Sequence, residues 1–580
     1  MMSLLNVFFR HSLLQNKSCE MKAFKLQESD CICVSGSCSS EVRIGHSLNT
    51  EEKEFIARRE QTVQESLKTL GIPCQDKVPK IALLGSGGGE RAMLGLLGSL
   101  DGFKETGLLD CVLYLSGVSG STWCMASLYQ DSDWSTKLDS VREKIIQRLK
   151  GPAVSWSETF SKLKKYYHEK DLFSLTDVWA VLIVTSFVKE IDERTISEKQ
   201  GHNEKDPFPI FTVIDKECKQ LKKEDPWVEI TPYEAGYSLT GAFVDVSRFG
   251  SQFEKGSKIK DQPEVDMLYL QSLCGSALAD EQNIWEAIKD FFKNLFQRKE
   301  ENLVEVWNEI PSSSIDDAGQ ILMDLVEMNL LTLKGKDTSD LDKTIRTKLL
   351  ELSGGKTQLI FPVEKPDKSE TKLYMKQFTL DVCDNMGVTV SFWPFDMCYA
   401  ICKCVVQWIW GRKYNCLYNM KDGRLPSILV ESEKRDYEDA GLLLNSPYMS
   451  VLRQERDIDL IISLDFSDGD PFMTVKDIAK ICKRQNIPFP EVIVPSGDII
   501  MPKDFYVFEG YTKAPTVIHI PLFNTVNCGA DKVEEWRKKY TTFQLSYRAE
   551  LIDPLLEVAG KNITNNKEKL LEEIRKIMKR

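Results

Sequence analysis

The sequence predicts an α/β fold with a mainly parallel central sheet and helices on both faces. Apolar runs typical of buried strands lie at Ile81–Leu84, Cys111–Leu115 and 458–466. The first two runs are each followed by a glycine-containing turn and then by a helical pattern, Ala92–Leu100 and Ser121–Tyr129. Strands that alternate with helices in this way pair in parallel, and the helices cover both faces of the sheet.

Three further segments are predicted around this core. Asn49 and Thr50 precede two glutamates and a run of helix formers, which predicts a helix that ends near Leu70. Residues from roughly 281 to 380 are polar and helical, and we expect them to form a cap-like insertion over the sheet. Residues 387–410 are rich in aromatic and β-branched side chains, which favours a buried strand followed by a helix.

The two ends of the chain differ from this core. Residues 1–40 are a variable extension that fits a poorly ordered segment, a weak amphipathic segment or an organelle leader, but not a signal peptide. The C-terminal segment 567–580 is basic and amphipathic, and residues 561–580 carry seven basic and three acidic side chains. Its apolar face is expected either to contact a membrane or to pack on the domain.

The composition excludes several classes of protein. The 580 residues include 42% hydrophobic and 28% charged side chains, which is not the balance of a disordered chain. The net charge of −12 argues against a nucleic-acid partner, and no clean apolar stretch predicts a transmembrane helix. The sixteen cysteines are scattered without a CxxC pair, which indicates reduced, cytosolic thiols and no zinc site.

The sharpest chemical signal is the segment Gly117–Ser121, GVSGS, between a predicted strand and a predicted helix. A strained strand–turn–helix elbow exposes a serine hydroxyl above a sheet, and it needs small neighbours because the backbones approach closely. Gly117 and Gly120 meet this need, while Ser121 stands where such elbows usually carry a glycine. The pattern favours Ser119 as a nucleophile over a purely structural turn.

A second signal is the glycine run GSGGGER that follows the strand at Ile81–Leu84. Its backbone N–H groups suit an anion, but Glu90 breaks both the dinucleotide and the P-loop patterns. An acyl-transfer oxyanion needs only two or three convergent N–H donors, and the loop provides them from Gly87, Gly88 and Gly89. Arg91 suits either bidentate binding of a phosphate or a salt bridge that holds the helix.

A serine nucleophile needs a base, and the residues leave two candidates open. His519 is the one histidine in a strongly apolar run, although a hydrogen-bonded core histidine has the same signature. Asp439 precedes a small-residue pair that lets the backbone turn sharply. Asp436 and Glu438 crowd it, however, and an acidic loop is commonly just solvated.

Together these motifs resemble those of the cytosolic, group IV phospholipases A2, most of all the gamma-type members. The oxyanion loop of that family reads here GSGGGERAM at Gly85–Met93, its nucleophile segment LSGVSGSTW at Leu115–Trp123, and its aspartate motif DAGLLLN at Asp439–Asn445. Further similar blocks lie between residues 45 and 540: EITPYEAGY, FGSQFEKG, CGSALA, WGRKYNCLY and DLIISLDFS. The resemblance is weakest over 281–380, which agrees with a cap.

The resemblance implies a patatin-like α/β core with a cap or lid insertion, in which residues 41–580 form the phospholipase catalytic domain. It implies a catalytic dyad of Ser119 and Asp439, an oxyanion hole at the three glycines and phosphate binding by Arg91. It implies neither a metal nor another cofactor. The expected activity is hydrolysis of acyl esters of glycerophospholipids and lysophospholipids through an acyl-serine intermediate, with transacylation when an acceptor lysophospholipid takes the acyl group.

Two departures from the family pattern concern the membrane. The oxyanion loop begins at Gly85, which leaves no room for the calcium-binding lipid module that many members carry at their N-terminus. The chain ends without the cysteine of a prenylation motif. We therefore expect a calcium-independent, cytoplasmic enzyme in peripheral contact with the phospholipid surface of intracellular membranes.

Two alternatives differ in kind from this reading. A Ser–His–Asp α/β-hydrolase acting on small soluble esters would use His519 as its base. A lipid-binding scaffold with a dead site is disfavoured, because the nucleophile and base motifs are both intact. Neither the preferred acyl position nor the preferred headgroup can be predicted from the sequence.

Overall fold

The computed structural model describes residues 41–580 except 75–76, 200–203, 222–224, 298–311, 357–369, 543 and 545. The predicted extension at 1–40 therefore lies outside the described residues. The rest belongs to one compact unit.

Fourteen strands are present in the described part of the chain. They are β1 Val42–Ile44, β2 Ile81–Gly85, β3 Tyr114–Gly117, β4 Phe208–Asp215, β5 Trp227–Ile230, β6 Glu234–Tyr237, β7 Ala242–Asp245, β8 Gln252–Glu254, β9 Ser257–Lys260, β10 Arg412–Tyr414, β11 Lys434–Asp439, β12 Leu460–Asp465, β13 Tyr506–Phe508 and β14 Thr516–Pro521.

Most of these strands pair in one large sheet, in the order β1-β7-β6-β5-β4-β3-β2-β12-β14-β13, with β11 beside β4 and β10 beside β11. The central pairs, from β4 through β3, β2 and β12 to β14, are parallel. The flanking pairs are antiparallel. The predicted α/β class is confirmed, with a sheet that is parallel at its centre and mixed at its edges. The carboxyl ends of the parallel strands share one edge, where open α/β sheets bind ligands.

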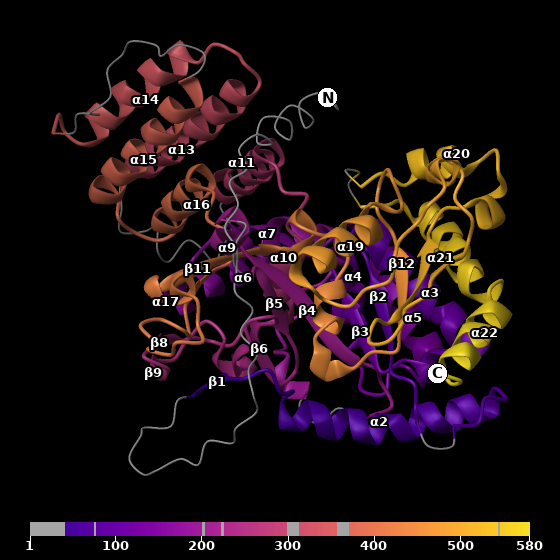
Figure 1. Ribbon diagram of the computed structural model, residues 1–580. Helices are drawn as coiled ribbons and strands as arrows, with labels where there is room; N and C mark the ends of the chain where they lie inside the picture. The colour runs from indigo at the N-terminus through magenta and orange to yellow at the C-terminus, as the bar shows by residue number, and fades with distance from the viewer. Residues whose placement is uncertain are drawn as a thin grey trace. The chain divides into compact units, whose positions relative to one another are not determined.

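Helices surround the sheet (Figure 1). They are α2 Thr50–Thr69, α3 Glu90–Thr106, α4 Gly120–Leu128, α5 Leu138–Leu149, α6 Trp156–Glu169, α7 Leu175–Trp179, α8 Thr185–Val188, α9 Lys216–Leu221, α10 Met267–Cys274, α11 Glu281–Gln297, α13 Ser312–Leu333, α14 Ser339–Leu352, α15 Thr371–Thr389, α16 Phe395–Gln407, α17 Ser427–Glu431, α18 Tyr448–Val451, α19 Met473–Gln485, α20 Val533–Lys539, α21 Ala549–Thr564 and α22 Lys567–Ile577. A π-helical turn, η2, spans Ala180–Val184 between α7 and α8. None of the described helices is long and apolar enough to cross a membrane.

Helices α11, α13, α14, α15 and α16 form a layer of their own, apart from the strands (Figure 1). Within it α11 packs on α13, α13 on α14 and α15, and α15 on α16. The layer meets the rest of the fold where α11 contacts η2 and α16 contacts α7. These helices include the described residues of the segment that we expect to be a cap.

Local sequence signals account for the elements around Ser119. The predicted helix near residue 50 is confirmed as α2, and the Asn49 side chain caps it by accepting a hydrogen bond from the Glu51 N–H group at 2.8 Å. Strand β2 is fully buried, as its unbroken apolar run predicts. The strand predicted at 111–115 begins only at Tyr114, because the preceding residues, Leu109–Cys111, form a 3-10 turn.

One other expectation is corrected, and one alternative is decided. The strand predicted within 387–410 is absent: α15 runs to Thr389 and α16 begins at Phe395. Most of the aromatic and β-branched side chains of this segment are buried or half-buried between helices and do not form a strand. The C-terminal segment forms α22, whose residues Leu570, Ile574 and Ile577 are buried against the domain. Its apolar face is therefore used in packing.

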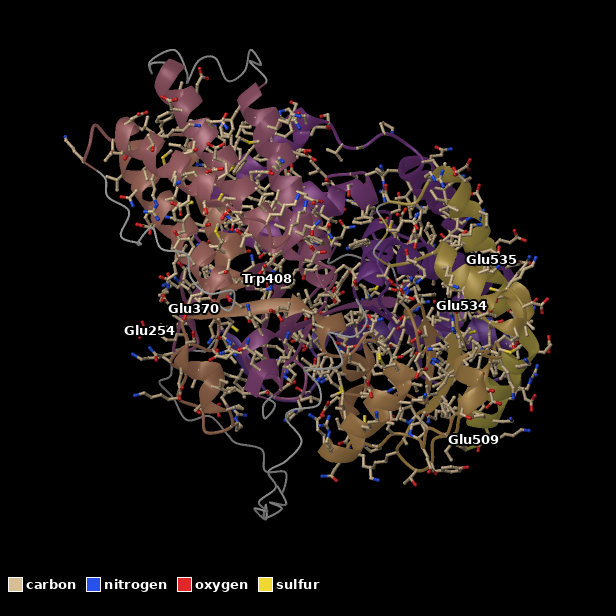
Figure 2. All side chains as sticks on the ribbon, turned by 90° about the horizontal axis from the view of Figure 1, so that it is seen from above. Glu254, Glu370, Trp408, Glu509, Glu534 and Glu535 are labelled. Atoms are coloured by element: carbon tan, nitrogen blue, oxygen red, sulfur yellow. The ribbon has the colours of Figure 1, made fainter. Side chains whose placement is uncertain are left out.

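A buried ion network fastens α2 to the sheet. Arg456 pairs with Glu52 of α2 and with Glu229 of β5, at 2.9 Å in each case. Arg453 pairs with Glu229 as well. Burial alone would raise the pKa of Glu229, but the two arginines lower it to about 2. Exposed glutamates such as Glu370 and Glu534 lie far apart on the surface (Figure 2).

Candidate active site

Ser119 stands at a strained elbow between β3 and α4. Its backbone angles are φ 53° and ψ −125°, in a region that residues with a side chain rarely adopt. The residue precedes the first turn of α4, and only 4% of it is exposed. This is the strand–turn–helix geometry of a serine nucleophile, and the strain is of the kind found at functional sites.

The small residues around the elbow bring the glycine loop over it. A Cβ atom on Gly120 would lie 1.8 Å from the carbonyl oxygen of Gly89, so only glycine fits there. Ser121, which replaces the usual glycine, donates its hydroxyl hydrogen to the carbonyl of Ser86 at 2.6 Å. The elbow and the loop are thus fixed against each other by a close backbone approach and one hydrogen bond.

Asp439 reaches Ser119 because two strands meet end to end along one edge of β4. Strand β3 runs parallel to β4 and ends with Gly117 opposite Phe211. Strand β11 runs antiparallel to β4 from the other direction and ends with Asp439 opposite Val213. Two residues along a strand span about 7 Å, so the elbow after β3 and the end of β11 converge.

A buried ion pair holds β11 in this register. Arg435 donates two hydrogen bonds of 2.7 Å to the two carboxylate oxygens of Asp215, and both side chains are fully buried. The charged neighbours of Asp439 have partners of their own: Asp436 pairs with Arg412 and Glu438 with Lys216. The acidic cluster of the sequence is therefore not a solvated loop, and Asp439 is the carboxylate that turns inward.

The carboxylate of Asp439 is held by backbone donors. The Ala277 N–H group donates to Oδ2 at 2.9 Å, and the Gly441 N–H group donates to Oδ1 at 2.8 Å. Burial raises the pKa of Asp439 to about 6, and these hydrogen bonds, together with one from the Ser119 hydroxyl, limit the rise. The group is thus oriented toward the serine, and its raised pKa suits a general base.

The glycine loop is clamped by a residue that the sequence analysis did not single out. Asn445 donates its side-chain N–H to the carbonyl of Gly87 at 3.0 Å, and its backbone carbonyl accepts from the Gly87 N–H at 3.1 Å. The Gly87 donor is therefore occupied in this arrangement. Within the described residues the N–H groups of Gly88 and Gly89 have no acceptor. The only signal for this clamp was the polar residue that ends the apolar run LLLN.

Arg91 is buried beside this loop without a carboxylate partner. Its guanidinium donates to the carbonyls of Phe466 at 2.8 Å and Tyr540 at 2.6 Å, and to the Thr542 hydroxyl at 2.7 Å. Burial lowers its pKa. In the described ranges no carboxylate lies within ion-pair distance, so the salt-bridge alternative has no support. Glu90 accepts from the Tyr547 N–H group at 2.6 Å, so both side chains tie the loop to the segment after α20.

His519 lies elsewhere on the sheet. It sits within β14 opposite Ser463 of β12, and β14 is three strands from β3, or about 14 Å. Its Nε2 group hydrogen-bonds the carbonyl of Pro471 at 2.7 Å. Burial lowers the pKa of His519, although Asp465 opposes the shift. The structure thus brings Ser119 together with Asp439 and the glycine loop but not with His519.

A cavity of about 530 Å³ lies near the elbow, lined by neighbours of the candidate site and not by Ser119 or Asp439. Trp123, one turn after Ser119 on α4, lines it, as does Leu278, whose Cδ1 atom lies 3.3 Å from where a Gly89 Cβ would stand. Thr542, the partner of Arg91, lines it too. Among the described residues no cluster of three or more His, Cys, Asp or Glu side chains is placed to hold a metal ion.

A serine on such an elbow, beside glycine N–H donors and a buried carboxylate, is the arrangement of an α/β acyl hydrolase. A family model described as the lysophospholipase catalytic domain matches residues 81–322. The chain is 36% identical to cytosolic phospholipase A2 gamma of Mus musculus over 91% of each chain. It is 34% identical to the Homo sapiens gamma protein over 92% of this chain and 96% of that one. The chain therefore belongs to the cytosolic, group IV phospholipase A2 family, and it is a phospholipase A2 or lysophospholipase hydrolase.

Solved structures agree on the fold. Human GIVD cytosolic phospholipase A2 matches with a TM-score of 0.61 and 22% identity, over 93% of this chain and 66% of that one. A second structure of that protein, in complex with methyl gamma-linolenyl fluorophosphonate inhibitor and terbium chloride, matches with a TM-score of 0.59. At these identities the likeness concerns the fold alone.

Proposed function

We propose that this protein hydrolyses acyl esters of glycerophospholipids and lysophospholipids with a Ser119–Asp439 dyad, without calcium. The observation that carries the proposal is the end-to-end meeting of β3 and β11 on β4, which sets Asp439 against the strained serine. The Ser–His–Asp alternative has no comparable support, because His519 is three strands from the nucleophile.

The dyad would work in two half-reactions. In the first, Asp439 takes the Ser119 proton as the oxygen attacks the ester carbonyl, and then returns it to the departing lysophospholipid oxygen. In the second, Asp439 takes a proton from water as the water oxygen attacks the acyl-serine, and then gives that proton to the Ser119 oxygen as the fatty acid leaves. A lysophospholipid hydroxyl in place of water yields a transacylation product instead.

The remaining residues would stabilise charge. The N–H groups of Gly88 and Gly89, at the N-terminus of α3, are free to receive the oxyanion, whereas Gly87 would first have to release Asn445. Arg91 uses its guanidinium to fix the loop to Tyr540 and Thr542. Its positive charge, which has no direct carboxylate partner among the described residues, would attract the substrate phosphate.

The setting of the reaction is part of the proposal. The substrate resides in a membrane, so the enzyme would meet it as a peripheral protein on the cytoplasmic surface of intracellular membranes. The names of its relatives support a cytosolic enzyme. Because α22 packs its apolar face into the domain, the membrane contact would come from other surfaces.

Product analysis tests this function directly. Phosphatidylcholine labelled separately at each acyl position is offered in mixed micelles to the wild-type protein and to Ser119→Ala. We expect labelled fatty acid from the wild type and only background release from the variant. A wild type that frees neither acyl chain, or a Ser119→Ala protein that retains the rate, would refute the proposal.

A further inference from the structure

The cavity near the elbow has two chemically different walls. The inner wall, close to the glycine loop and the elbow, is mainly apolar, with Trp123 and Leu278 beside the polar Thr542. The outer wall is one face of α11, and it is polar at helical spacing: Asn283, Glu286, Asp290 and Asn294. A phospholipid has the same division, since an apolar chain and a polar headgroup leave the ester in different directions.

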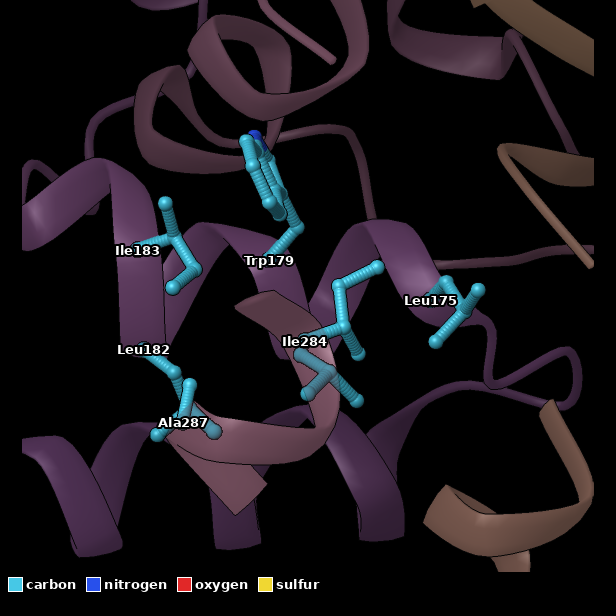
Figure 3. Close-up of a pocket in the computed structure, with 7 residues that line it drawn as sticks. Leu175, Trp179, Leu182, Ile183, Ile284 and Ala287 are labelled. Carbon is cyan, nitrogen blue, oxygen red and sulfur yellow. The ribbon is translucent and has the colours of Figure 1, made fainter. Parts of the chain in front are cut away.

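Helix α11 is held firmly in this position. Its neighbouring face packs Ile284 and Ala287 against Trp179, Leu182 and Ile183 around a small apolar pocket (Figure 3). Because the apolar face is anchored on the α7–η2 segment, the polar face is fixed toward the cavity. The charges on that face therefore keep a fixed relation to the site.

Those charges are all negative. Among the described residues, the lining includes the carboxylates of Glu286 and Asp290 and no lysine, arginine or histidine. Glu286 is partly compensated by Lys334 at 3.3 Å and by a hydrogen bond from Gln282. In the described part of the chain the Asp290 carboxylate has no partner. An anionic headgroup would meet repulsion here, whereas an ammonium group would find a counter-charge.

Two aromatic rings line the same cavity as these carboxylates. Trp156, the first residue of α6, and Phe291, the residue after Asp290, both line the cavity, with ring centroids 5.0 Å apart. Aromatic faces attract cations, and quaternary ammonium groups are bound in this way when a carboxylate is close. The combination of rings and uncompensated acid fits a choline-type headgroup.

We infer that the outer part of this cavity is a headgroup subsite that selects zwitterionic phospholipids with an ammonium group over anionic ones, with Asp290 and Trp156 as specificity determinants. The inference rests on the proposed function, because it concerns the substrate of the same site. The acyl chain lies along the apolar wall, and the headgroup amine lies against α11.

A charge-reversal experiment tests the subsite. Phosphatidylcholine and phosphatidylglycerol with identical acyl chains are compared in mixed micelles of neutral detergent, so that the interface carries little charge. We expect Asp290→Lys to lower the ratio of the two kcat/KM values by about tenfold, and Asp290→Asn to lower it by less. Trp156→Leu is expected to slow phosphatidylcholine hydrolysis more than phosphatidylglycerol hydrolysis.

The matched control is Asp317→Lys, which reverses an exposed acid on α13 that does not line the cavity. It changes the net charge equally and should leave the ratio unchanged. The inference is overturned when Asp290→Lys and Asp290→Asn keep the wild-type ratio, or when both substrates slow equally. Failure of the proposed function looks different, because the wild type would then hydrolyse neither lipid.

Discussion

Asp439 and Asp465 are both buried carboxylates at the end of a strand in the same sheet, and burial raises the pKa of both. Asp465 ends β12 beside His519, and its oxygens accept hydrogen bonds from Thr474 at 2.8 Å and from the Ser467 N–H at 3.0 Å. Asp439 ends β11 and faces a strained serine. The histidine and acid that a triad would need therefore occur together, but away from Ser119.

The presence of a histidine and an acid in the sequence therefore does not identify the base of the proposed reaction. Their positions in the sheet are what distinguish them. His519 lies within its strand, and its Nε2 is bound to Pro471, so its ring has no reach toward β3. Asp439 stands where two strands meet end to end on β4. Strand ends at the carboxyl edge are where side chains from separate segments converge.

Removing the base should give the largest effect. In Asp439→Asn the amide cannot accept the serine proton, so we expect kcat/KM to fall by roughly a thousandfold or more, about 4 kcal/mol of transition-state stabilisation. Asp465→Asn, a change to the other buried acid, serves as the matched control and should cost far less. The folding of both variants is checked by thermal unfolding. Equal losses of kcat/KM in the two folded variants would contradict a special role of Asp439 as the base.

The next effect should come from Arg91→Lys. An ammonium group cannot reproduce the three hydrogen bonds to Phe466, Tyr540 and Thr542, and we expect a loss on the order of tenfold in phospholipid turnover. A neutral acyl ester without phosphate separates the two roles of this side chain. If the loss affects the phospholipid alone, Arg91 binds phosphate; if it affects both esters, Arg91 positions the loop. A rate close to wild type on both would contradict either role.

The pH dependence should report Asp439. A base with a pKa of about 6 is protonated below that value, so kcat/KM should rise through pH 6 and be about a tenth of its maximum at pH 5. Burial also raises the pKa of the nearby Glu90 carboxyl, to about 7. Glu90→Gln keeps the acceptor for Tyr547 and removes that titration. If the rise in kcat/KM through pH 6 is absent in Glu90→Gln, the group that titrates is Glu90 and not Asp439.

The smallest effect should come from calcium removal. The described residues offer no cluster of metal ligands, and no step of the dyad requires a cation. Hydrolysis of phosphatidylcholine with a calcium chelator should stay within about twofold of the untreated rate. A tenfold loss that added calcium restores would contradict the expectation.

The sequence predicted the local parts of this site better than their assembly. The buried strand at Ile81, the elbow at Ser119 and the cap of α2 are encoded by neighbouring residues, and the structure has all of them. The resemblance to the family added Asp439. The contacts that hold the site, such as Asn445 on Gly87 and Arg435 on Asp215, join residues more than two hundred positions apart. No local pattern encodes such pairs.

The same limit explains one segment that the sequence left open and one that it misassigned. The apolar face of α22 and the aromatic run before α16 are equally consistent with membrane contact, strand formation or packing between helices. Only the neighbours decide, and here both are packed inside the protein. Apolar periodicity reports which side of a helix is buried, but it does not report the partner.

The central claim is that Asp439, and not His519, is the base for Ser119. The most direct test is kcat/KM on phosphatidylcholine for His519→Asn, measured beside Ser119→Ala and with the fold of both proteins checked by thermal unfolding. The account predicts that His519→Asn is less stable, because it disturbs a buried hydrogen bond to Pro471, yet keeps its activity within about tenfold of wild type. Folded His519→Asn protein as inactive as folded Ser119→Ala would contradict the account.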